Sequence, residues 1–325
     1  MPRGCFCTII TANYLPYARA MAESIQRFGQ YEVKVFVAGG GPGSPGDPAD
    51  PSLLYREQVC TQGLARTIAM RYPDHRSDEF RWSMKPALLE FLLVEQDYDR
   101  VCCVDWDLFF YRDPGFLLEQ LGNCAVLLSP HYRSSDPEAD AWNFELNFRD
   151  GVFNGGFVGA SKAGLEAMRW WARACAYRCE VDFEQGLYDD QKYLDLLHSR
   201  FEGVEVIRHR GCNVAEWNRI DCGRERSADG EVLIHNKDPI VFIHFDTLTV
   251  REILGGRDPL LVDHLREYQE AIKRHDPGYR DVFERKEELL AQKWMPPRST
   301  PKRARVMEKI RRKASSLLAL FSSPR

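Results

Sequence analysis

The sequence lacks several features that define large classes of proteins. Its 325 residues contain no run of about 18 consecutive apolar residues, so we expect no helix that spans a membrane. The chain begins MPRG and continues directly into the strand-like CFCTII, so we expect no secretory leader. None of the ten cysteines forms a C-x-x-C pair, and Cys102 and Cys103 lie inside an apolar segment. We therefore expect reduced cysteines that pack as small apolar side chains in a cytosolic protein.

The sequence also has no excess of positive charge. Lys and Arg number 44 against 48 Asp and Glu, and the net charge of -4 indicates no nucleic-acid partner. Hydrophobic residues make up 44% and aromatic residues 12% of the chain, which excludes a disordered protein. The length allows a large core in one or two domains.

A short acidic motif after an apolar segment is the strongest functional signal. The apolar residues Val101–Val104 lead into Asp105-Trp106-Asp107, and such a run is typical of a strand covered on both faces. Residues two apart on an extended segment point the same way, so Asp105 and Asp107 share a face and Trp106 points away. Two neighbouring carboxylates suit Mn2+ or Mg2+, whose remaining positions suit the diphosphate of a nucleotide. The alternative is a pair of aspartates that caps the following turn.

The opening of the chain predicts an α/β sheet. Cys5–Ile10 and Tyr31–Ala38 have strand patterns and flank an amphipathic helix over Tyr17–Phe28, which is the start of a parallel sheet. The loop Thr11-Ala12-Asn13-Tyr14 follows the first strand, at the edge where a base or ribose docks in such sheets. The alternative is that Asn13 only caps the next helix.

The segments before the acidic motif include a possible anion site. We expect a loop over Gly39–Pro51 and mostly helix over Ser52–Arg71. A strong helical pattern follows Pro86, with Ser83 as its expected cap. Lys85 then stands near the positive end of a helix, where it suits an anion. The alternative is a solvated lysine.

Two further motifs carry polar residues after the acidic one. A polar and aromatic stretch over His131–Asp150 is expected to be an active-site loop or lid. In the strand pattern Phe153-Asn154-Gly155-Gly156, the glycines indicate close approach to the backbone, as by a sugar ring bound to Asn154. The alternative is a β-bulge. Tyr188-Asp189-Asp190-Gln191 opens a predicted helix, where carboxylates also stabilise the helix start without any other role.

The last motifs lie near residue 244. The segment Gly211–Asn218 is dense in polar and aromatic residues but indicates no role by itself. The strand pattern Ile240–Ile243 ends at His244, and a histidine at that position is a natural third metal ligand. The alternative is a structural histidine.

The ordered set DWD, FNGGFVG, DDQ and HFD resembles the nucleotide-diphospho-sugar transferases. Over about Cys5–Asp246 it is similar to the retaining, metal-dependent enzymes of the glycogenin and lipopolysaccharide-galactosyltransferase type. The resemblance implies a GT-A (Rossmann-like) fold, a mixed and mainly parallel α/β sheet flanked by helices, with a C-terminal helical extension. It also implies a function for each motif. Asp105, Asp107 and His244 would hold Mn2+ or Mg2+.

The resemblance assigns the remaining site residues as well. Asp189, Asp190 and Gln191 would lie at the reacting carbon. The donor would be bound by the residues Thr11, Ala12, Asn13, Tyr14, Arg81, Lys85, Asp105, Trp106, Asp107, Asn154, Gly155 and Gly156. Unlike the family, this chain has no glycine and lysine after the metal histidine. It is therefore open whether Lys85, Arg81 or Arg251 neutralises the leaving phosphate.

The implied activity is transfer of a hexose from a nucleotide-diphosphate donor, with UDP the commonest in the family, in polysaccharide biosynthesis. The acceptor would be a saccharide or a lipid-linked glycan, and the reaction would retain the anomeric configuration. Retention would proceed by front-side attack or through a covalent intermediate on Asp190, whereas inversion would need Asp190 or Asp189 as general base. The rivals are a haloacid-dehalogenase-like phosphatase, which shares the D-x-D pattern, and an inactive membrane-associated scaffold of the GT-A fold.

The C-terminal part of the chain changes in character. We expect a catalytic domain over residues 1–250, helices packed on it over 251–293, and a basic amphipathic tail over 294–325. Such a tail suits the anionic membrane surface of the cytoplasmic leaflet, which would place the protein peripherally on the inner face of the plasma membrane. The alternatives are a tail packed on the domain and a disordered one.

Overall fold

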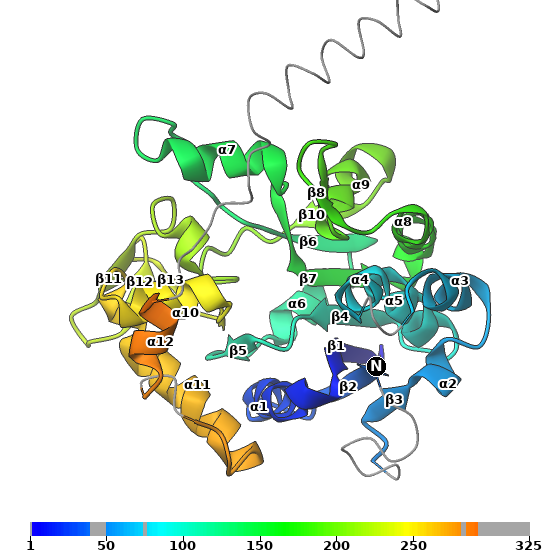
Figure 1. The fold of residues 1–325 in the computed structure, drawn as a ribbon, viewed down its shortest axis with the longest axis horizontal. Helices are drawn as coiled ribbons and strands as arrows, with labels where there is room; N and C mark the ends of the chain where they lie inside the picture. Colours follow the sequence, from blue (N-terminus) through cyan, green and yellow to red (C-terminus); the bar gives the residue numbers. More distant parts are fainter. Residues whose placement is uncertain (1, 40–49, 74–76, 281–283, 292–325) are drawn as a thin grey trace, which may run out of the picture. The chain divides into compact units, whose positions relative to one another are not determined.

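The computed structural model describes residues 2–39, 50–73, 77–280 and 284–291 (Figure 1). The chain divides into a compact unit over Met1–Arg285 and a second unit over Lys286–Arg325. Helix α12 (Lys286–Ala291) belongs to the second unit. The predicted basic tail, and most of the loop predicted over Gly39–Pro51, lie outside the described residues.

A seven-stranded sheet forms the centre of the first unit, with strand order β10-β6-β7-β4-β1-β2-β3. All neighbours in it are parallel except β7, which runs antiparallel to both β4 and β6. Smaller sheets pair β14 with β5, β8 with β9, and β12 with β11 and β13. The strands are β1 (Gly4–Thr11), β2 (Glu32–Gly39), β3 (Leu53–Tyr55), β4 (Arg100–Val104), β5 (Leu108–Phe110), β6 (Val126–Pro130), β7 (Phe153–Ser161), β8 (Val181–Asp182), β9 (Leu187–Tyr188), β10 (Val204–Val206), β11 (Arg224–Arg226), β12 (Val232–Ile234), β13 (Asp238–Pro239) and β14 (Phe242–His244).

The apolar strands are buried on both faces because helices cover the sheet from both sides. In β4, Val101 and Cys103 face one hydrophobic core, and Cys102 and Val104 face the other. Alternate residues of a strand point to opposite faces, so a strand buried on both faces carries a continuous apolar run. This explains why β4 shows no alternation of apolar and polar residues.

Helices α3, α4, α5 and α8 lie together on one side of the sheet (Figure 1). Helix α1 packs on the other side and is itself covered by α11. The ion pairs Arg27–Glu267 and Arg274–Glu23 join these two helices. The helices are α1 (Leu15–Gln26), α2 (Arg56–Val59), α3 (Gly63–Arg71), α4 (Ser77–Ser83), α5 (Lys85–Val94), α6 (Gly115–Gln120), α7 (Ala141–Arg149), α8 (Leu165–Tyr177), α9 (Leu194–Arg200), α10 (Thr247–Leu254), α11 (Val262–His275) and α12, with the short 3-10 helices η1 (Ala12–Tyr14), η3 (Lys162–Gly164), η4 (Gln191–Tyr193), η5 (Glu216–Asn218) and η6 (Pro259–Leu261).

The predicted GT-A type of architecture, a mixed and mainly parallel sheet flanked by helices, is confirmed. Within the described ranges, no helix has the length and apolar character that crossing a bilayer requires. All ten cysteines are free, and all but Cys60 are buried. The proposed domain division at residues 250 and 293 remains a prediction.

Some local predictions were wrong. Residues Leu53–Tyr55, expected to be helical, form edge strand β3 beside β2, because a three-residue apolar segment fits either structure and pairing decides. Ser83 does not cap α5, since α4 runs almost directly into it and the Ser83 hydroxyl donates backwards to Glu79 O and Phe80 O. The loop over His131–Asp150 contains a helix, α7, which the sequence analysis did not predict.

The pairing of β5 with β14 builds the site. Strand β5 begins directly after the acidic motif, and its partner β14 ends at His244, which lies opposite Leu108. The backbone N–H of Phe245 donates to Asp107 O at 2.9 Å. A strand that begins 134 residues after the start of β5 therefore carries its terminal histidine to the two aspartates.

Candidate active site

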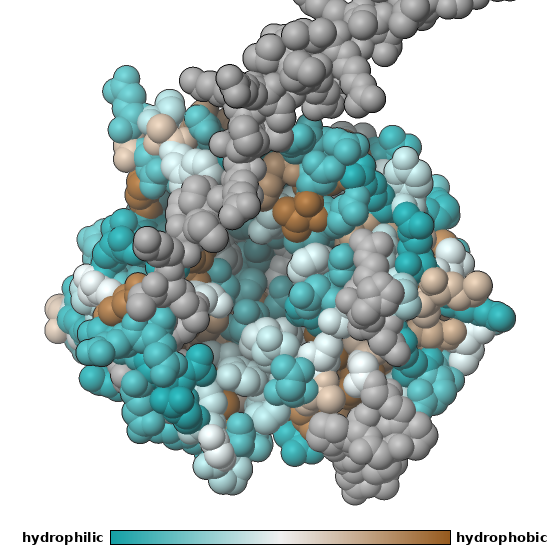
Figure 2. Space-filling view, viewed as in Figure 1, coloured by the Kyte–Doolittle hydropathy of each residue, from teal (hydrophilic) through white to brown (hydrophobic). Residues whose placement is uncertain are grey.

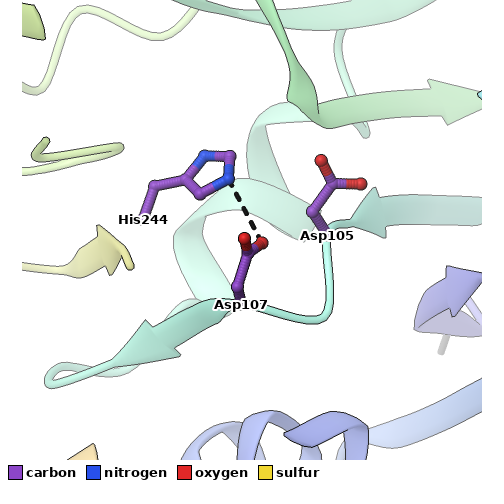
Figure 3. A group of neighbouring side chains, drawn as sticks. All are labelled: Asp105, Asp107 and His244. Carbon is purple, nitrogen blue, oxygen red and sulfur yellow. Dashed lines mark ion pairs between the residues drawn. The ribbon is translucent and has the colours of Figure 1, made fainter. Parts of the chain in front are cut away.

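Three side chains converge at the carboxyl end of β4 (Figure 3). Asp105 follows β4, Asp107 precedes β5, and His244 ends β14, and one possible ligand atom from each lies within 4.8 Å of the other two. His244 Nε2 lies 3.2 Å from Asp107 Oδ1. Two carboxylate oxygens and one imidazole nitrogen form a donor set that suits Mn2+.

The charges of these groups also fit a cation. Burial disfavours the ionised form of Asp107, but the contact with His244 outweighs it and lowers the pKa of Asp107. Burial disfavours protonated His244, but Asp107 outweighs this and raises the pKa of His244 to about 9. The two side chains therefore form an ion pair without net charge, and a metal ion would bind here by displacing the proton of His244 Nε2. His244 Nδ1 is buried without a hydrogen-bond partner among the described residues.

Strand β7 leaves room for the histidine. A Cβ atom on Gly156 would lie 2.5 Å from both His244 Cε1 and Asn154 Oδ1, closer than real contacts allow. Gly156 O also accepts a hydrogen bond from the Asp105 N–H at 2.9 Å. The sequence analysis attributed these glycines to a sugar ring, but side chains of the protein itself already make glycine necessary at position 156. The alternative of a strand irregularity also holds, because the register of β6 against β7 shifts between Leu128 and Pro130.

Lys85 is buried at the centre of the site. Its Nζ lies 3.1 Å from Asp105 Oδ1 and 3.6 Å from Asp190 Oδ2, and it donates to Gly155 O at 2.8 Å. Burial alone would lower the pKa of Lys85, but Asp105 and Asp190 raise it, so the side chain stays charged. The alternative of a solvated lysine is therefore wrong. Lys85 connects the candidate metal carboxylates to the Asp189–Gln191 motif.

Asp189 and Asp190 have different surroundings. Asp189 Oδ1 accepts from the Gln191 N–H at 2.8 Å, which is the helix-start contact named as its alternative role. The Asp190 side chain is 1% exposed, and apart from the ion pair with Lys85 its Oδ2 has no hydrogen-bond partner among the described residues. Burial raises the pKa of Asp190 well above its ordinary value, although Lys85 opposes the shift. Asp190 is thus a buried carboxyl group that lies next to Lys85 and has one oxygen without a hydrogen bond within the described part of the chain.

Gln191 has all the polar atoms of its side chain engaged. Oε1 accepts from Gly155 N–H at 2.8 Å and from Asn154 Nδ2 at 3.2 Å, and Nε2 donates to Asp150 O at 3.0 Å. These bonds tie β7 to the end of the loop that holds α7. In this structure Gln191 therefore has a structural role, because it holds β7 and the loop together.

His131 is a site residue that the sequence analysis did not identify. Its Nε2 lies 3.1 Å from Asn154 Nδ2, and its Nδ1 lies 3.0 Å from Gly151 O. Burial lowers the pKa of His131 well below its ordinary value, so the ring is neutral and accepts from Asn154. Its only sequence signal was its position directly after a buried strand. Next to it, Arg133 and Asp150 form a buried ion pair at 2.7 Å.

The loop predicted to receive a base lies beside Trp106. The Tyr14 and Trp106 rings stack at 4.1 Å, and Tyr17 meets Trp106 edge-on at 5.3 Å. Trp106 therefore packs against the rings of Tyr14 and Tyr17 and extends the wall formed by the predicted base loop. Asn13 does not cap α1, whose N-cap is Tyr14, and instead accepts from the Thr11 hydroxyl at 2.6 Å.

The two remaining cationic candidates differ in their surroundings. Arg81 on α4 lies 3.3 Å from Asp78, and its charge contributes to the lowered pKa of Asp107. Arg251 lies on α10, and its Nε is buried without a partner among the described residues. Arg81 thus shares the electrostatic environment of the acidic motif.

Comparisons with known proteins give relatives without an assigned activity. No family model matches the chain. The uncharacterized protein YfnF of Bacillus subtilis (strain 168) is 26% identical over 252 residues, which are 74% of this chain and 80% of that protein. The uncharacterized protein YfnD of the same organism is 33% identical over 177 residues, which are 53% of this chain and 54% of that protein.

Solved structures of similar fold have the names of glycosyltransferases. Mouse xyloside xylosyltransferase 1 has a TM-score of 0.46 at 13% identity, covering 75% of this chain and 98% of that one. The galactosyltransferase LgtC, in complex with donor and acceptor sugar analogs, has 0.45 at 17% identity, covering 90% and 97%. The bifunctional WbbM glycosyltransferase has 0.43 at 18% identity, covering 75% and 46%.

Proposed function

We propose that the protein is a metal-dependent glycosyltransferase of the hexosyltransferase class that uses a nucleotide-diphosphate sugar. The observation that carries this proposal is the convergence of Asp105, Asp107 and His244, joined through Lys85 to Asp190. The Asp105, Asp107 and His244 ligand set, beside the charged Lys85, suits a metal ion with an anionic diphosphate. The separate buried carboxyl group of Asp190 suits a position at the anomeric carbon, where the bond to the diphosphate breaks and the bond to the acceptor forms.

The chemistry divides between the metal set and the neighbouring residues. A bound Mn2+ or Mg2+ would act as a Lewis acid that stabilises the negative charge of the departing diphosphate. Lys85 fixes the position of Asp105, and Arg81 adds positive charge near Asp107. Asn154 and Gly155 border the place of the donor sugar. The loop Thr11–Tyr14, with Trp106, forms the wall on which a base such as uracil would stack.

Asp190 is the residue that we assign to the reacting carbon. Its unpartnered oxygen is available to stabilise positive charge at that carbon or to attack it, and either role fits a retaining reaction. We assign Gln191 to positioning Asn154 and Gly155, because its amide oxygen accepts from both residues and its amide nitrogen donates to Asp150 O. UDP as the nucleotide and a saccharide or lipid-linked glycan as the acceptor remain proposals.

The test is a thermal-shift panel of nucleotide sugars, each with and without Mn2+. A ligand that binds only the native state raises the melting temperature, so we expect an Mn2+-dependent shift with one nucleotide sugar. Asp107→Ala should abolish that shift, whereas Asp113→Ala, a change at an exposed aspartate beyond β5, should leave it intact. A shift that survives undiminished in Asp107→Ala would contradict the proposed metal site.

A phosphatase assay and the binding panel together separate the rivals. Release of phosphate from simple phosphomonoesters, without any sugar nucleotide, would favour a phosphatase of the haloacid-dehalogenase type. Failure to bind any nucleoside diphosphate with Mn2+ would favour an inactive scaffold. Cytoplasmic location and attachment of the basic tail to an anionic membrane surface are separate proposals and have their own test below.

A further inference from the structure

The segment Gly211–Asn218 received no role from its sequence, but the structure places it against the metal histidine. Val214 forms a parallel β-bridge with Ile243, and its carbonyl accepts from the His244 N–H at 3.0 Å. The Trp217 ring lies edge-on to His244 at 5.2 Å and to His131 at 5.5 Å. The segment is therefore a wall of the site described above.

The turn at the end of this segment is rigidly held. Asn218 Oδ1 accepts from the Ala215 N–H at 3.1 Å, and Asn218 Nδ2 donates to Asn213 O at 2.8 Å. Arg224 Nη2 donates to Ala215 O at 2.6 Å, and Arg224 is itself paired with buried Asp258. A turn fixed by so many side-chain bonds presents the residues between them in a defined geometry, which is what selective binding of a small ligand requires.

Glu216 is one of the residues that this rigid turn holds in place. Thr249 holds it twice, by donating its hydroxyl to Glu216 Oε2 at 2.8 Å and by accepting from the Glu216 N–H at 3.1 Å. Burial, with Asp246 next in effect, raises the pKa of Glu216 to about 8, although Arg133 and His244 oppose the shift. The carboxyl group is only partly exposed, so its conformation is fixed before any ligand arrives.

Trp217 is the second residue that the turn holds in place. It is 7% exposed, and its Nε1–H is buried with no acceptor among the described residues. A buried donor without a partner is costly, and native structures rarely tolerate one unless a ligand or water satisfies it. The Trp217 ring that carries this N–H lies edge-on to both histidines of the site, and it directly follows Glu216 in the turn.

We propose that Glu216 and Trp217 form the acceptor subsite and bind the hydroxyl groups of a hexopyranoside. A sugar hydroxyl both donates and accepts hydrogen bonds, and the turn offers one carboxyl group and one N–H donor side by side. This inference rests on the proposed glycosyl transfer and names the acceptor class for the same site. Thr249 acts as a positioning residue, because it touches Glu216 and not the sugar.

The test uses the full chain and the nucleotide sugar that gives the Mn2+-dependent thermal shift. The acceptor probes are the methyl glycosides of glucose, galactose, mannose and N-acetylglucosamine, and transfer is followed by mass spectrometry of the disaccharide. The variants are Glu216→Gln, Trp217→Phe and Thr249→Val. Glu205→Gln, at the exposed position of β10, and Trp170→Phe on α8 are the matched controls.

The expected result is a selective effect on the acceptor. Each of the three variants lowers kcat/KM for the glycoside by about tenfold or more, because a hydrogen bond to the sugar is lost or misplaced. The KM for the donor changes by less than about twofold, which a general loss of structure would not produce. The Mn2+-dependent thermal shift shows that each variant is folded, and the controls behave as the wild type.

The other outcomes overturn the inference in distinguishable ways. If Glu216→Gln and Trp217→Phe transfer as the wild type does, these residues do not bind the acceptor. If the wild type hydrolyses the donor but glycosylates none of the four probes, the acceptor is not a hexopyranoside. If no nucleotide sugar gives a shift at all, the proposed function itself fails and the acceptor subsite with it.

Discussion

Lys85 and Asp105 form an ion pair in which the ammonium nitrogen lies 3.1 Å from a carboxylate oxygen, and the lysine side chain is 6% exposed. The same ammonium group lies 3.6 Å from Asp190. One buried cation therefore holds together two carboxylates that would otherwise repel each other. The stability of the site and its chemistry depend on the same side chain.

Replacing this lysine should cost both stability and activity. Lys85→Met leaves Asp105 and Asp190 without their buried counter-charge, and we expect the free energy of unfolding to fall by about 3–5 kcal/mol. Turnover should disappear as well. The measurement is urea unfolding of the variant beside Lys162→Met, which removes an exposed ion pair and should change stability little. Equal stability of the two variants would contradict the bridging role.

A methyl group added at Gly156 should disturb the metal site specifically. In Gly156→Ala the new Cβ would lie 2.5 Å from His244 Cε1, so the imidazole has to move and the Mn2+ response should be lost. In Gly223→Ala the Cβ meets nothing within 4 Å, so this variant should keep the response. Isothermal titration with Mn2+ and UDP measures both. An unchanged Mn2+ affinity in Gly156→Ala would show that His244 does not bind the metal.

Asp190 and Gln191 should respond to substitution in opposite ways. Gln191→Leu leaves the Gly155 N–H and the Asp150 carbonyl without partners, and each should cost about 1–3 kcal/mol of unfolding free energy. Asp190→Asn keeps the shape of the side chain and leaves Lys85 paired with Asp105, so stability should fall less than in Lys85→Met while turnover is lost. Paired unfolding and activity measurements decide this. An active, stable Gln191→Leu enzyme would contradict the structural role of the Gln191 hydrogen bonds.

Glu216 should make stability depend on pH in a defined direction. Its pKa is raised from 4.5 to about 8, so between these values the folded protein keeps a proton that the unfolded chain has lost. Stability contributed by this group is therefore present below pH 4.5 and lost as pH rises towards 8. We expect the melting temperature of Glu216→Gln, relative to the wild type, to rise between pH 5 and pH 9. A constant difference would show that Glu216 ionises normally.

The basic C-terminal tail should be separable from catalysis. A chain ending at Trp294 lacks every basic residue of the tail, so it should no longer pellet with liposomes that contain anionic lipid. Donor hydrolysis should persist, because the site lies within Met1–Arg285. Unchanged liposome binding by the shortened chain would rule the tail out as the membrane anchor.

The sequence predicted the main sheet well because its strands are buried on both faces. A continuous apolar run such as Val101–Val104 predicts a strand with protein packed on both of its faces. The polar residues that follow it must then lie at the carboxyl end of the strand. The sequence could not determine which distant strand pairs with β5. That β14 pairs with it, and so brings His244 to Asp107, depends on packing between segments far apart in the chain.

The structure corrected predictions in which one residue type has several local uses. Ser83 had the residue type and spacing of a helix cap, but the helix before it leaves no extended residue for capping. The role of Gln191 at the reacting carbon stays a prediction, and only the fold shows that its amide bonds to Asn154, Gly155 and Asp150. His131 belongs to no short motif, so its contact with Asn154 appears only in three dimensions.

The reversed direction of β7 has a consequence for how this protein can change its specificity. Because β6 and β7 are antiparallel neighbours, the segment that joins Pro130 to Phe153 leaves and re-enters the sheet at one edge, the edge that carries the acidic motif. Its length and composition can therefore vary without shifting any strand. Exchange of α7 and its flanking residues between relatives offers a route to new substrates on an unchanged framework.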